Sequence, residues 1–422
     1  MPSLGVLWSQ YGPYHFARIS ALKTHAASQT IHALEIASRT HDYEWSRSGA
    51  TVNLITLFPG DVAERLSFWR VFLRTRRSFA QLRLDVCFIP SYSPKQPLAA
   101  LLAARSLGIR TVLMIDSHKG TMRSRAVGTW LKRRLVRLFD AALVGGHPQM
   151  TYVESLGMHR DHIFVGYDSV DNDYFARRAA ETRARAAEFR HRYDLPSRYF
   201  LSLGRFLPKK NLGTLIRAYR RFLDSAATKT HLVMVGSGSE ETNLRMLCDE
   251  LRLPVYNKMA SKIDVQESST ADSAPGVHFY GFRQIEENPI FYALADAFIL
   301  PSAVEEWGLV LNEALSCSLP VVVSETVGSA EDLLRAVSPP GSAKNIRQNG
   351  FVFNPNSAAS LTEALLTLDS NPDLRQTMGQ AGRLIVEDFS CERFARSALK
   401  AAKTALDRGL PLRQDSSVSG ER

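Results

Sequence analysis

The chain has 422 residues, of which 45% are hydrophobic and 22% charged, so it has the composition of a soluble globular protein and is too long for one ordinary core. No apolar run approaches the roughly 18 residues of a membrane-spanning helix, and the four cysteines lie far apart without a C-x-x-C spacing, which argues against a transmembrane protein, a zinc site and a disulfide framework. The net charge of +10 belongs to the first half, because residues 1–196 carry 27 Lys and Arg against 16 Asp and Glu, and the remainder carries 25 against 26.

The first part of the chain alternates short apolar runs with helical segments. Its opening run has no Lys or Arg before it, so we expect a first buried strand and not a secretion signal. Strands are predicted at 4–8, 51–57, 85–90, 111–116, 141–146 and 163–168, with helices at 62–83, 96–107 and 122–139. Because these Val- and Ile-rich runs alternate with helices, they predict parallel β-α-β units whose sheet is covered on both faces.

A polar, charge-rich helical stretch over 168–196 interrupts this alternation, and a second series follows it. Strands of the second series are predicted at 199–204, 231–238, 277–282, 297–302, 320–325 and 350–355. Residues 253–276 lack periodicity and are predicted to form a surface insertion. The last helix is predicted over 389–406 with Ser390 as its N-cap.

The two series predict an α/β fold with two Rossmann-like, doubly wound domains that face each other across a cleft. In such sheets ligands bind outside the carboxyl ends of the strands, so the loops that follow the strands are the places to look for chemistry. The expected divisions are an N-terminal domain over 1–170, a connector over 171–196, a C-terminal domain over 197–388, a last helix over 389–409 that returns towards the N-terminal domain, and a disordered tail over 410–422.

The loop after 199–204 carries cations beside a helix start. It reads GRFLPKKN and places Gly204, Arg205, Lys209 and Lys210 just before the helix. These charges and the free N–H groups of a helix start would suit a phosphate group, and a solvated basic turn is the alternative. After the next strand, Gly236 and Gly238 would let the backbone approach a ligand closely, although a tight turn would use them equally.

Two glutamates flank the helix that begins near Gly308. Glu305 lies in the loop after 297–302, and Glu313 is separated from it by seven residues, more than one turn inside the helix. The helix start also leaves unpaired N–H groups at Trp307–Val310. The spacing therefore predicts carboxylates and N–H donors at one strand end.

Together these segments resemble the retaining nucleotide-sugar glycosyltransferases of the GT-B fold, family 4, the group with glycogen synthase-like and sucrose synthase-like enzymes. GRFLPKKN matches the family's G-R-x-x-x-K-N donor loop, VGSGSEE matches its V-G-x-G turn, and PSAVEEWGLVLNEALSCSLPVV matches its E-x7-E segment. The final FSCERFA is similar to the family's last helix. The resemblance is nearly continuous from about 199 to 400 and weak over the N-terminal half.

The resemblance implies roles for the matched residues. Arg205 and Lys210 would neutralise the donor diphosphate, Glu313 would accept hydrogen bonds from the ribose, and Glu305 would contact the transferred sugar. Backbone N–H groups near Gly308 would bind sugar hydroxyls or a phosphate oxygen. The implied donor set is Gly204, Arg205, Lys210, Gly236, Gly238, Glu305, Trp307, Gly308, Leu309, Val310 and Glu313, with Glu305, His118, Lys210 and Arg205 as catalytic candidates.

Other positions depart from the family's pattern or lie in the N-terminal half. Glu306 stands where the family's E-G-F-G has its first glycine, so its carboxylate could alter the choice of sugar, and Ser318 replaces another glycine as a packing variation. In the N-terminal half the family supplies a loop after the first strand and a histidine after a later one. Gly12, Tyr14 and His15 are therefore acceptor candidates, and His118 would meet the sugar, with an ordinary strand-end histidine as the alternative.

Two further patterns allow competing interpretations. Asp171–Asp173 reads DND and could be the D-x-D metal motif of the other nucleotide-sugar transferase fold, but a single Rossmann-like domain with D-x-D would not explain two. We favour the connector and expect no metal or other cofactor, the nucleotide-sugar being a substrate. Basic residues crowd 64–83 and 123–139, and helices of this kind can lie on anionic membranes, with a solvated basic face as the alternative.

The expected activity is retaining transfer of a hexose from a nucleotide-sugar donor to a hydroxyl acceptor on a glycan, glycolipid or small molecule. The enzyme would work in the cytoplasm or at the inner face of the membrane, and it would not bind nucleic acid, since no recognition motif accompanies the charge. A glycoside phosphorylase and a non-catalytic glycosyltransferase-like binding protein are the alternatives. A non-catalytic binding protein is disfavoured by the intact set of Arg205, Lys210, Glu305 and Glu313.

Overall fold

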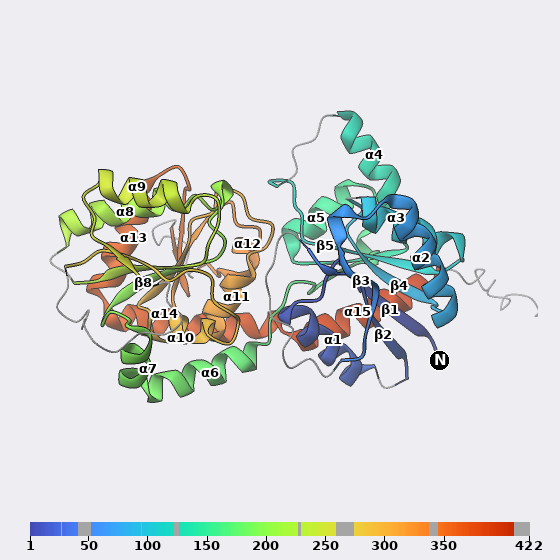
Figure 1. Ribbon diagram of the computed structural model, residues 1–422, viewed down its shortest axis with the longest axis horizontal. Helices are drawn as coiled ribbons and strands as arrows, with labels where there is room; N and C mark the ends of the chain where they lie inside the picture. Colours follow the sequence, from blue (N-terminus) through green and yellow to red (C-terminus); the bar gives the residue numbers. More distant parts are fainter. Residues whose placement is uncertain are drawn as a thin grey trace, which may run out of the picture.

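The computed structural model describes residues 1–26, 28–40, 52–93, 95–121, 126–226, 229–258, 274–336 and 345–408. Two α/β domains lie side by side, each with a central sheet and helices on both faces (Figure 1). The predicted fold class is therefore confirmed. The tail expected over 410–422 and residues 259–273 of the expected insertion lie outside the described residues.

The N-terminal sheet is parallel throughout and has the order β3-β2-β1-β4-β5-β6-β7. Its strands are β1 Ser3–Trp8, β2 Thr30–Arg39, β3 Leu54–Val62, β4 Val86–Pro90, β5 Arg110–Ile115, β6 Ala141–Val144 and β7 Ile163–Val165. Its helices are α1 Pro13–His25, α2 Phe68–Leu82, α3 Lys95–Ser106, α4 Ala126–Val136 and α5 His147–Ser155. Every strand predicted in this half is present, and β2 is an additional one.

The C-terminal sheet has the order β10-β11-β9-β8-β12-β13-β15-β14, with only β14 antiparallel among the described strands. Its strands are β8 Tyr199–Leu203, β9 His231–Val235, β10 Val255–Asn257, β11 Val277–Phe279, β12 Ala297–Leu300, β13 Val321–Ser324, β14 Ile346–Arg347 and β15 Gly350–Phe353. Its helices are α8 Leu212–Ser225, α9 Glu241–Glu250, α10 Asn288–Leu294, α11 Leu309–Ser316, α12 Ala330–Leu333, α13 Ala358–Ser370 and α14 Pro372–Val386. The edge strand β10 lies where the sequence predicted only an insertion.

The strand order fixes where a ligand can bind in the C-terminal domain. The chain leaves β8 towards β9 on one side of the sheet and leaves β12 towards β13 on the other, and β8 and β12 are neighbours. The sheet order therefore reverses between them, and loops diverge at such a switch point to leave a crevice. The loops after β8 and β12 are those that carry the donor motifs.

Two helices follow the N-terminal domain in the chain, α6 Asn172–Ala184 and α7 Ala186–Tyr193. They lie along the lower edge of the C-terminal domain (Figure 1). The last helix, α15 Cys391–Asp407, crosses back beneath the N-terminal sheet. Its Ser390 side chain accepts a hydrogen bond from the Arg393 N–H, which confirms the predicted N-cap. Phe394 of α15 is fully buried and stacks on Trp8 at 6.4 Å, so the end of the chain completes the N-terminal core.

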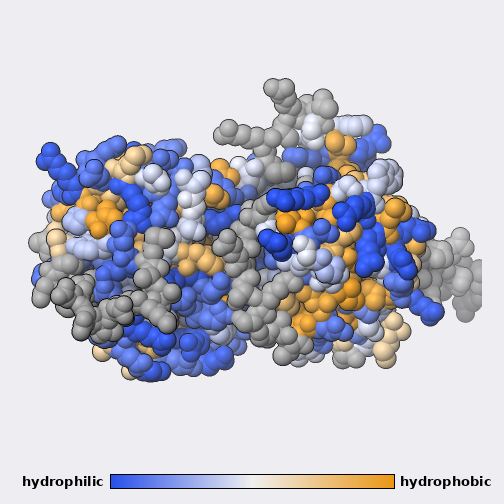
Figure 2. Space-filling model, viewed as in Figure 1, coloured by the Kyte–Doolittle hydropathy of each residue, from blue (hydrophilic) through white to orange (hydrophobic). Residues whose placement is uncertain are grey.

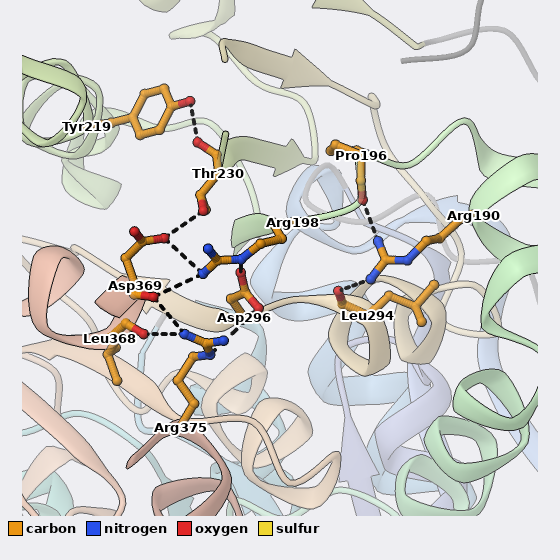
Figure 3. A network of polar contacts seen from close by, with 10 residues as sticks. All are labelled: Arg190, Pro196, Arg198, Tyr219, Thr230, Leu294, Asp296, Leu368, Asp369 and Arg375. Atoms are coloured by element: carbon orange, nitrogen blue, oxygen red, sulfur yellow. Dashed lines mark hydrogen bonds and ion pairs between the residues drawn. The ribbon is translucent and has the colours of Figure 1, made fainter. Parts of the chain in front are cut away.

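A network of charged side chains ties together the amino ends of the C-terminal strands (Figure 3). Arg198, just before β8, forms ion pairs with Asp296 at 3.0 Å and Asp369 at 2.9 Å. Arg375 approaches Asp296 at 3.7 Å, and the Thr230 hydroxyl donates to Asp369. This network lies at the edge of the sheet opposite the donor loops, so it holds the strand starts and leaves the carboxyl ends open.

None of the helices in the described ranges combines the length and the apolarity that crossing a bilayer requires.

Candidate active site

A cavity of about 530 Å³ lies where the two domains meet. The C-terminal domain contributes the loops after β8, β9 and β12, and the N-terminal domain contributes Tyr14, Asp116 and Asp168. Most of the predicted donor residues line it: Gly204, Arg205, Lys210, Gly236, Gly238, Glu305, Trp307, Gly308, Leu309 and Val310. The structure therefore brings together segments more than 100 residues apart in the sequence.

Lys210 and Glu305 form an ion pair on the wall of the cavity. The Ser302 hydroxyl also donates to the Glu305 carboxylate at 2.9 Å, and Glu305 is 6% exposed. The two loops are fastened to each other, because the Asn211 amide donates to Pro301 O at 3.1 Å and the Ala303 N–H donates to Lys209 O at 2.8 Å. This fastening holds the cation and the carboxylate at one point of the switch region.

Glu306 forms a second pair beside the first. Its carboxylate lies 2.7 Å from the Lys209 ammonium. Burial alone would raise the pKa of Glu306, but the hydrogen bond and the charge of Lys209 outweigh it and lower that pKa. The carboxylate that replaces the family's glycine is therefore ionised and lies inside the cavity.

The glycines after β8 and β9 allow the two loops to touch. Gly236 has a φ of +139°, and a Cβ there would stand 1.9 Å from Gly204 O. A Cβ on Gly238, whose φ is +156°, would stand 2.3 Å from Phe206 O. Loop packing therefore requires both glycines, and the same close contact leaves the backbone of both on the cavity wall.

The start of α11 is shaped by Gly308 and Trp307. Gly308 is the N-cap with a φ of +91°, which favours glycine. The Trp307 indole turns away to donate to Asn312 Oδ1 at 2.9 Å and is 2% exposed. It packs on the N-terminal domain, since a Cβ on Gly145 would stand 2.8 Å from its ring. The first turn of α11 therefore lines the cavity through Gly308, Leu309 and Val310.

Glu313 lies behind the cavity wall and does not line it. It is fully buried in α11, where its carboxylate accepts hydrogen bonds from the Tyr14 hydroxyl and from the Asn288 amide at 3.4 Å. Burial raises the pKa of Glu313 to about 7, and the hydrogen bonds from Tyr14 and Asn288 oppose that rise. Tyr14 and Asn288, which line the cavity, therefore separate Glu313 from it.

The N-terminal candidates have different surroundings. Gly12 is the N-cap of α1, and its N–H donates to His15 Nδ1 at 2.9 Å. The His15 ring packs against Trp8 at 4.6 Å, and burial with the nearby Arg18 cation lowers the pKa of His15 to about 3. Of the three acceptor candidates, only Tyr14 lines the cavity. Gly12 and His15 form the cap of α1 instead.

His118 lies next to Glu305 but outside the cavity lining. Its Nδ1 accepts from the Gly120 N–H at 3.2 Å, and its Nε2 is 3.0 Å from Glu305 O. With Nδ1 accepting, Nε2 is the nitrogen that donates to the carbonyl. The ring thus holds the backbone of the Glu305 loop and has no ring nitrogen left for a sugar in this arrangement.

Several cavity residues were missed in the sequence. Asp116 and Asp168 follow β5 and β7, and Phe282, Arg283 and Asn288 follow β11. Each stands at the end of a predicted strand or shortly after it, so its position was a usable signal. The motifs that carried the resemblance did not include them.

The DND sequence and the basic helices are the remaining patterns with competing interpretations. Asp171 caps α6 by accepting from the Tyr174 N–H at 2.9 Å, and Asp173 pairs with Arg383 at 3.2 Å, as a connector would use them. On the N-terminal domain, α2 and α4 expose Trp69, Leu73, Trp130 and Leu131 among Arg and Lys side chains. Hydrophobic and strongly hydrophilic surface alternate over this domain in Figure 2.

Comparison with known proteins agrees with this geometry. Residues 197–371, which hold the donor loops, match the family model described as Glycosyl transferases group 1. The chain is 26% identical over 195 residues to an alpha-monoglucosyldiacylglycerol synthase of Acholeplasma laidlawii, covering 46% of this chain and 40% of that protein. It is 28% identical over 300 residues to a GDP-mannose-dependent alpha-(1-6)-phosphatidylinositol monomannoside mannosyltransferase of Mycolicibacterium smegmatis, covering 68% of each.

Solved structures extend the likeness to both domains. Sucrose-phosphate synthase from Thermosynechococcus elongatus superposes with a TM-score of 0.69 at 16% identity over 97% of this chain and 100% of that chain. Anabaena Alr3699/HepE in complex with UDP and glucose superposes with a TM-score of 0.66 at 15% identity over 96% of this chain and 100% of that chain. At such identities the matches show the fold, which is the GT-B arrangement of two facing domains.

Proposed function

We propose that the protein is a glycosyltransferase that moves a sugar from a nucleotide-sugar donor to a hydroxyl acceptor with retention of configuration, as the family 4 resemblance implies. The observation that carries the proposal is the Lys210–Glu305 pair at the switch point of the C-terminal sheet, beside the start of α11 and inside a cavity closed by the N-terminal domain. Cations, N–H donors and a carboxylate are the groups that a sugar diphosphate needs.

Binding of the donor would rearrange the Lys210–Glu305 ion pair. A diphosphate oxygen would compete with Glu305 for Lys210, and Arg205 lies on the same wall. The Glu305 carboxylate would then be free to accept from sugar hydroxyls and to stabilise positive charge at the reacting carbon. The relatives support such a donor, because their names specify GDP-mannose for one and a complex with UDP and glucose for another.

Charge stabilisation by this chain's own residues would supply most of the catalysis. The leaving diphosphate gains negative charge as its bond to the sugar breaks, and Arg205, Lys210 and the α11 N–H groups would offset it without a metal ion. Closure of the cleft excludes water that would otherwise hydrolyse the donor.

We also propose that the N-terminal domain contacts an anionic membrane at the cytoplasmic face. Trp69 is 68% exposed on α2 and Trp130 is 57% exposed on α4, and Arg134 lies over the Trp130 ring at 5.0 Å. Exposed aromatic side chains among basic ones suit the headgroup region. Co-sedimentation with liposomes rich in phosphatidylserine at low salt, weakened by Trp69→Ser with Trp130→Ser, would support the contact, and no co-sedimentation would refute it.

A thermal-shift panel of UDP, GDP, ADP and dTDP sugars tests the donor proposal. One nucleotide class should raise the midpoint of wild type by mass action. Lys210→Ala should remove that shift and lower transfer by about 100-fold or more, whereas Arg221→Ala on the exposed face of α8 should keep both. Absence of any nucleotide-sugar shift, together with phosphate-dependent release of sugar, would favour a phosphorylase.

A further inference from the structure

Asp116 follows β5 and Asp168 follows β7, and both lie on the wall of the cavity that the N-terminal domain provides. We propose that these two carboxylates form a subsite for a protonated amino group on the acceptor. The inference rests on the proposed function, because a donor held by the C-terminal loops would leave this N-terminal wall to the acceptor. Its substrate class would be amino sugars or other amine-bearing polyols.

Asp168 is buried with only part of its charge balanced. It is 4% exposed, and its Oδ1 lies 3.6 Å from an Arg18 nitrogen. Its other oxygen, Oδ2, has no hydrogen-bond partner among the described residues, and the same holds for Arg18 Nη2. Arg18 also donates its Nε–H to Ser169 O at 3.0 Å. One acceptor of a nearly buried carboxylate on the cavity wall is therefore unused.

Asp116 has still less compensation. Within the described ranges it forms no ion pair, and the negative charge of Glu306 repels it. Arg18 and Lys209 attract it more weakly than Glu306 repels it, and Lys209 is already paired with Glu306 at 2.7 Å. Burial raises the pKa of Asp116 and Glu306 raises it further, and burial raises the pKa of Asp168 to about 8. Asp116 therefore has no ion-pair partner among the described residues, and Asp168 has only the 3.6 Å contact with Arg18.

An ammonium group fits this wall better than the other ligand types. Among the residues that the structure describes, no three His, Cys, Asp or Glu side chains are grouped to hold a metal ion. A phosphate would oppose ionisation of the two acids still further, and a neutral hydroxyl would bring no charge to favour it. An ammonium brings both the charge and three N–H donors, which two separate carboxylates can share.

Donor binding would strengthen the preference of the Asp116 and Asp168 wall for an ammonium group. Once the diphosphate draws Lys209 and Lys210 towards itself, Glu305 and Glu306 lose part of their present partners. The cavity then holds four carboxylates near the reacting centre, Asp116, Asp168, Glu305 and Glu306. The N-terminal wall would consequently bind a cation more tightly with the donor site filled than with it empty.

Calorimetric titration with UDP present tests the subsite, with D-glucosamine, N-acetyl-D-glucosamine and D-glucose as matched probes. We expect glucosamine to bind wild type at least 10-fold more tightly than the two neutral sugars. Asp116→Asn and Asp168→Asn should each reduce that ratio to less than threefold, and Glu363→Gln on the exposed face of α13 should keep it. The same ratio in both cavity variants, equal affinities in wild type or no glucosamine binding would each overturn the proposal.

The UDP shift separates this outcome from failure of the proposed function. Asp116→Asn keeps the donor loops intact, so UDP should raise its midpoint as in wild type. If UDP stabilises wild type and glucosamine shows no preference, the amine subsite is wrong and the donor site stands. If no nucleotide stabilises wild type, the proposed function itself fails.

Discussion

Glu313 couples the two domains through a single side chain. It belongs to the C-terminal helix α11, and its strongest partner, the Tyr14 hydroxyl, comes from the N-terminal helix α1. A ribose that bound Glu313 would have to share this carboxylate with Tyr14 or displace it. Tyr14 would then lie against the nucleotide, which makes it part of the donor site as well as an acceptor candidate.

Because Glu313 ionises, the contribution of Tyr14 to the stability of the fold depends on pH. Its pKa is about 7 in the folded protein and about 4.3 in an unfolded chain. The raised value means that its contribution to stability is complete below about pH 4.3 and is lost as pH rises through 7. Tyr14→Phe removes a hydrogen bond that favours the charged form, so the folded pKa rises further and the loss extends to higher pH.

We therefore predict that Tyr14→Phe lowers the free energy of unfolding by about 1 kcal/mol at pH 5 and by about 2–3 kcal/mol at pH 8. Chemical denaturation of wild type and variant at the two pH values measures the difference. In a Glu313→Gln background the same substitution should cost equal amounts at both pH values. Equal costs in the native background would contradict the assigned ionisation.

The residues that the sequence could and could not predict differ in kind. Lys210 and Glu305 belong to motifs in loops after two different strands, so the sequence predicted both for the donor site, and their contact is seen only in the structure. Asp116 and Asp168 belong to none of the matched motifs, because the resemblance is weak over the N-terminal half. Whether Glu313 lines the cavity depends on Tyr14, which lies about 300 residues earlier, and no local pattern reports such a contact.

At the scale of elements, the contact between the loops after β8 and β9 depends on Gly236. A methyl group there would meet the Gly204 backbone oxygen at 1.9 Å and the Phe206 ring at 3.2 Å. Gly108 is the matched control, since its φ of +72° is also positive but nothing lies within 4 Å of a Cβ. The two positions therefore separate steric clash from backbone strain.

We predict that Gly236→Ala lowers the free energy of unfolding by more than about 2 kcal/mol, whereas Gly108→Ala lowers it by about 1 kcal/mol. Because Gly204 begins the donor loop, Gly236→Ala should also abolish the nucleotide-dependent thermal shift. Denaturation curves and the shift assay measure both effects. Equal costs for the two substitutions would show that the loop contact is not tight.

Most strands were predictable because parallel, doubly covered strands read as short Val- and Ile-rich runs. Among the strands that were not predicted, β2 contains Glu35, whose charge hides the pattern. Glu35 is fully buried and accepts from the Tyr11 N–H at 3.0 Å and the Thr56 hydroxyl at 2.7 Å. Its partners lie before and after β2 in the chain, so only the folded sheet explains a carboxylate in a strand core.

At the scale of the molecule, the chain end helps to stabilise its beginning. Phe394 of α15 packs on Trp8 of β1, and the Ser397 hydroxyl donates to Val165 O of β7 at 2.7 Å. Phe394→Ala should therefore lower the stability of the N-terminal domain by about 3–5 kcal/mol although residue 394 follows the C-terminal domain in sequence. Leu384→Ala, at a side chain 68% exposed on α14, should change it by less than about 0.5 kcal/mol.

Limited proteolysis with mass spectrometry distinguishes the domain that unfolds. In Phe394→Ala the first new cleavages should fall in the N-terminal domain, and the C-terminal domain should stay resistant. Cleavage that began in the C-terminal domain would contradict the packing of α15 described above.

Domain closure also fixes the loop that carries Glu305. From the N-terminal domain, His118 holds Glu305 O at 3.0 Å and the Gln149 amide donates to Glu306 O at 2.8 Å. Gln149 is fully buried, and its Oε1 also accepts from the Gly146 N–H at 3.1 Å to cap α5. The nucleotide loops lie in the C-terminal domain, so these contacts should affect transfer more than donor binding.

We predict that Gln149→Ala lowers kcat about 10-fold, equivalent to about 1.4 kcal/mol, and changes the donor KM less than twofold. Gln149→Glu is the deciding control, because its carboxylate keeps the acceptor for Gly146 and removes the donor to Glu306. If the bond between domains sets the position of Glu305, Gln149→Glu should have the same kcat defect as Gln149→Ala. If Gln149 only caps α5, Gln149→Glu should restore kcat, since a carboxylate at a helix start is favourable.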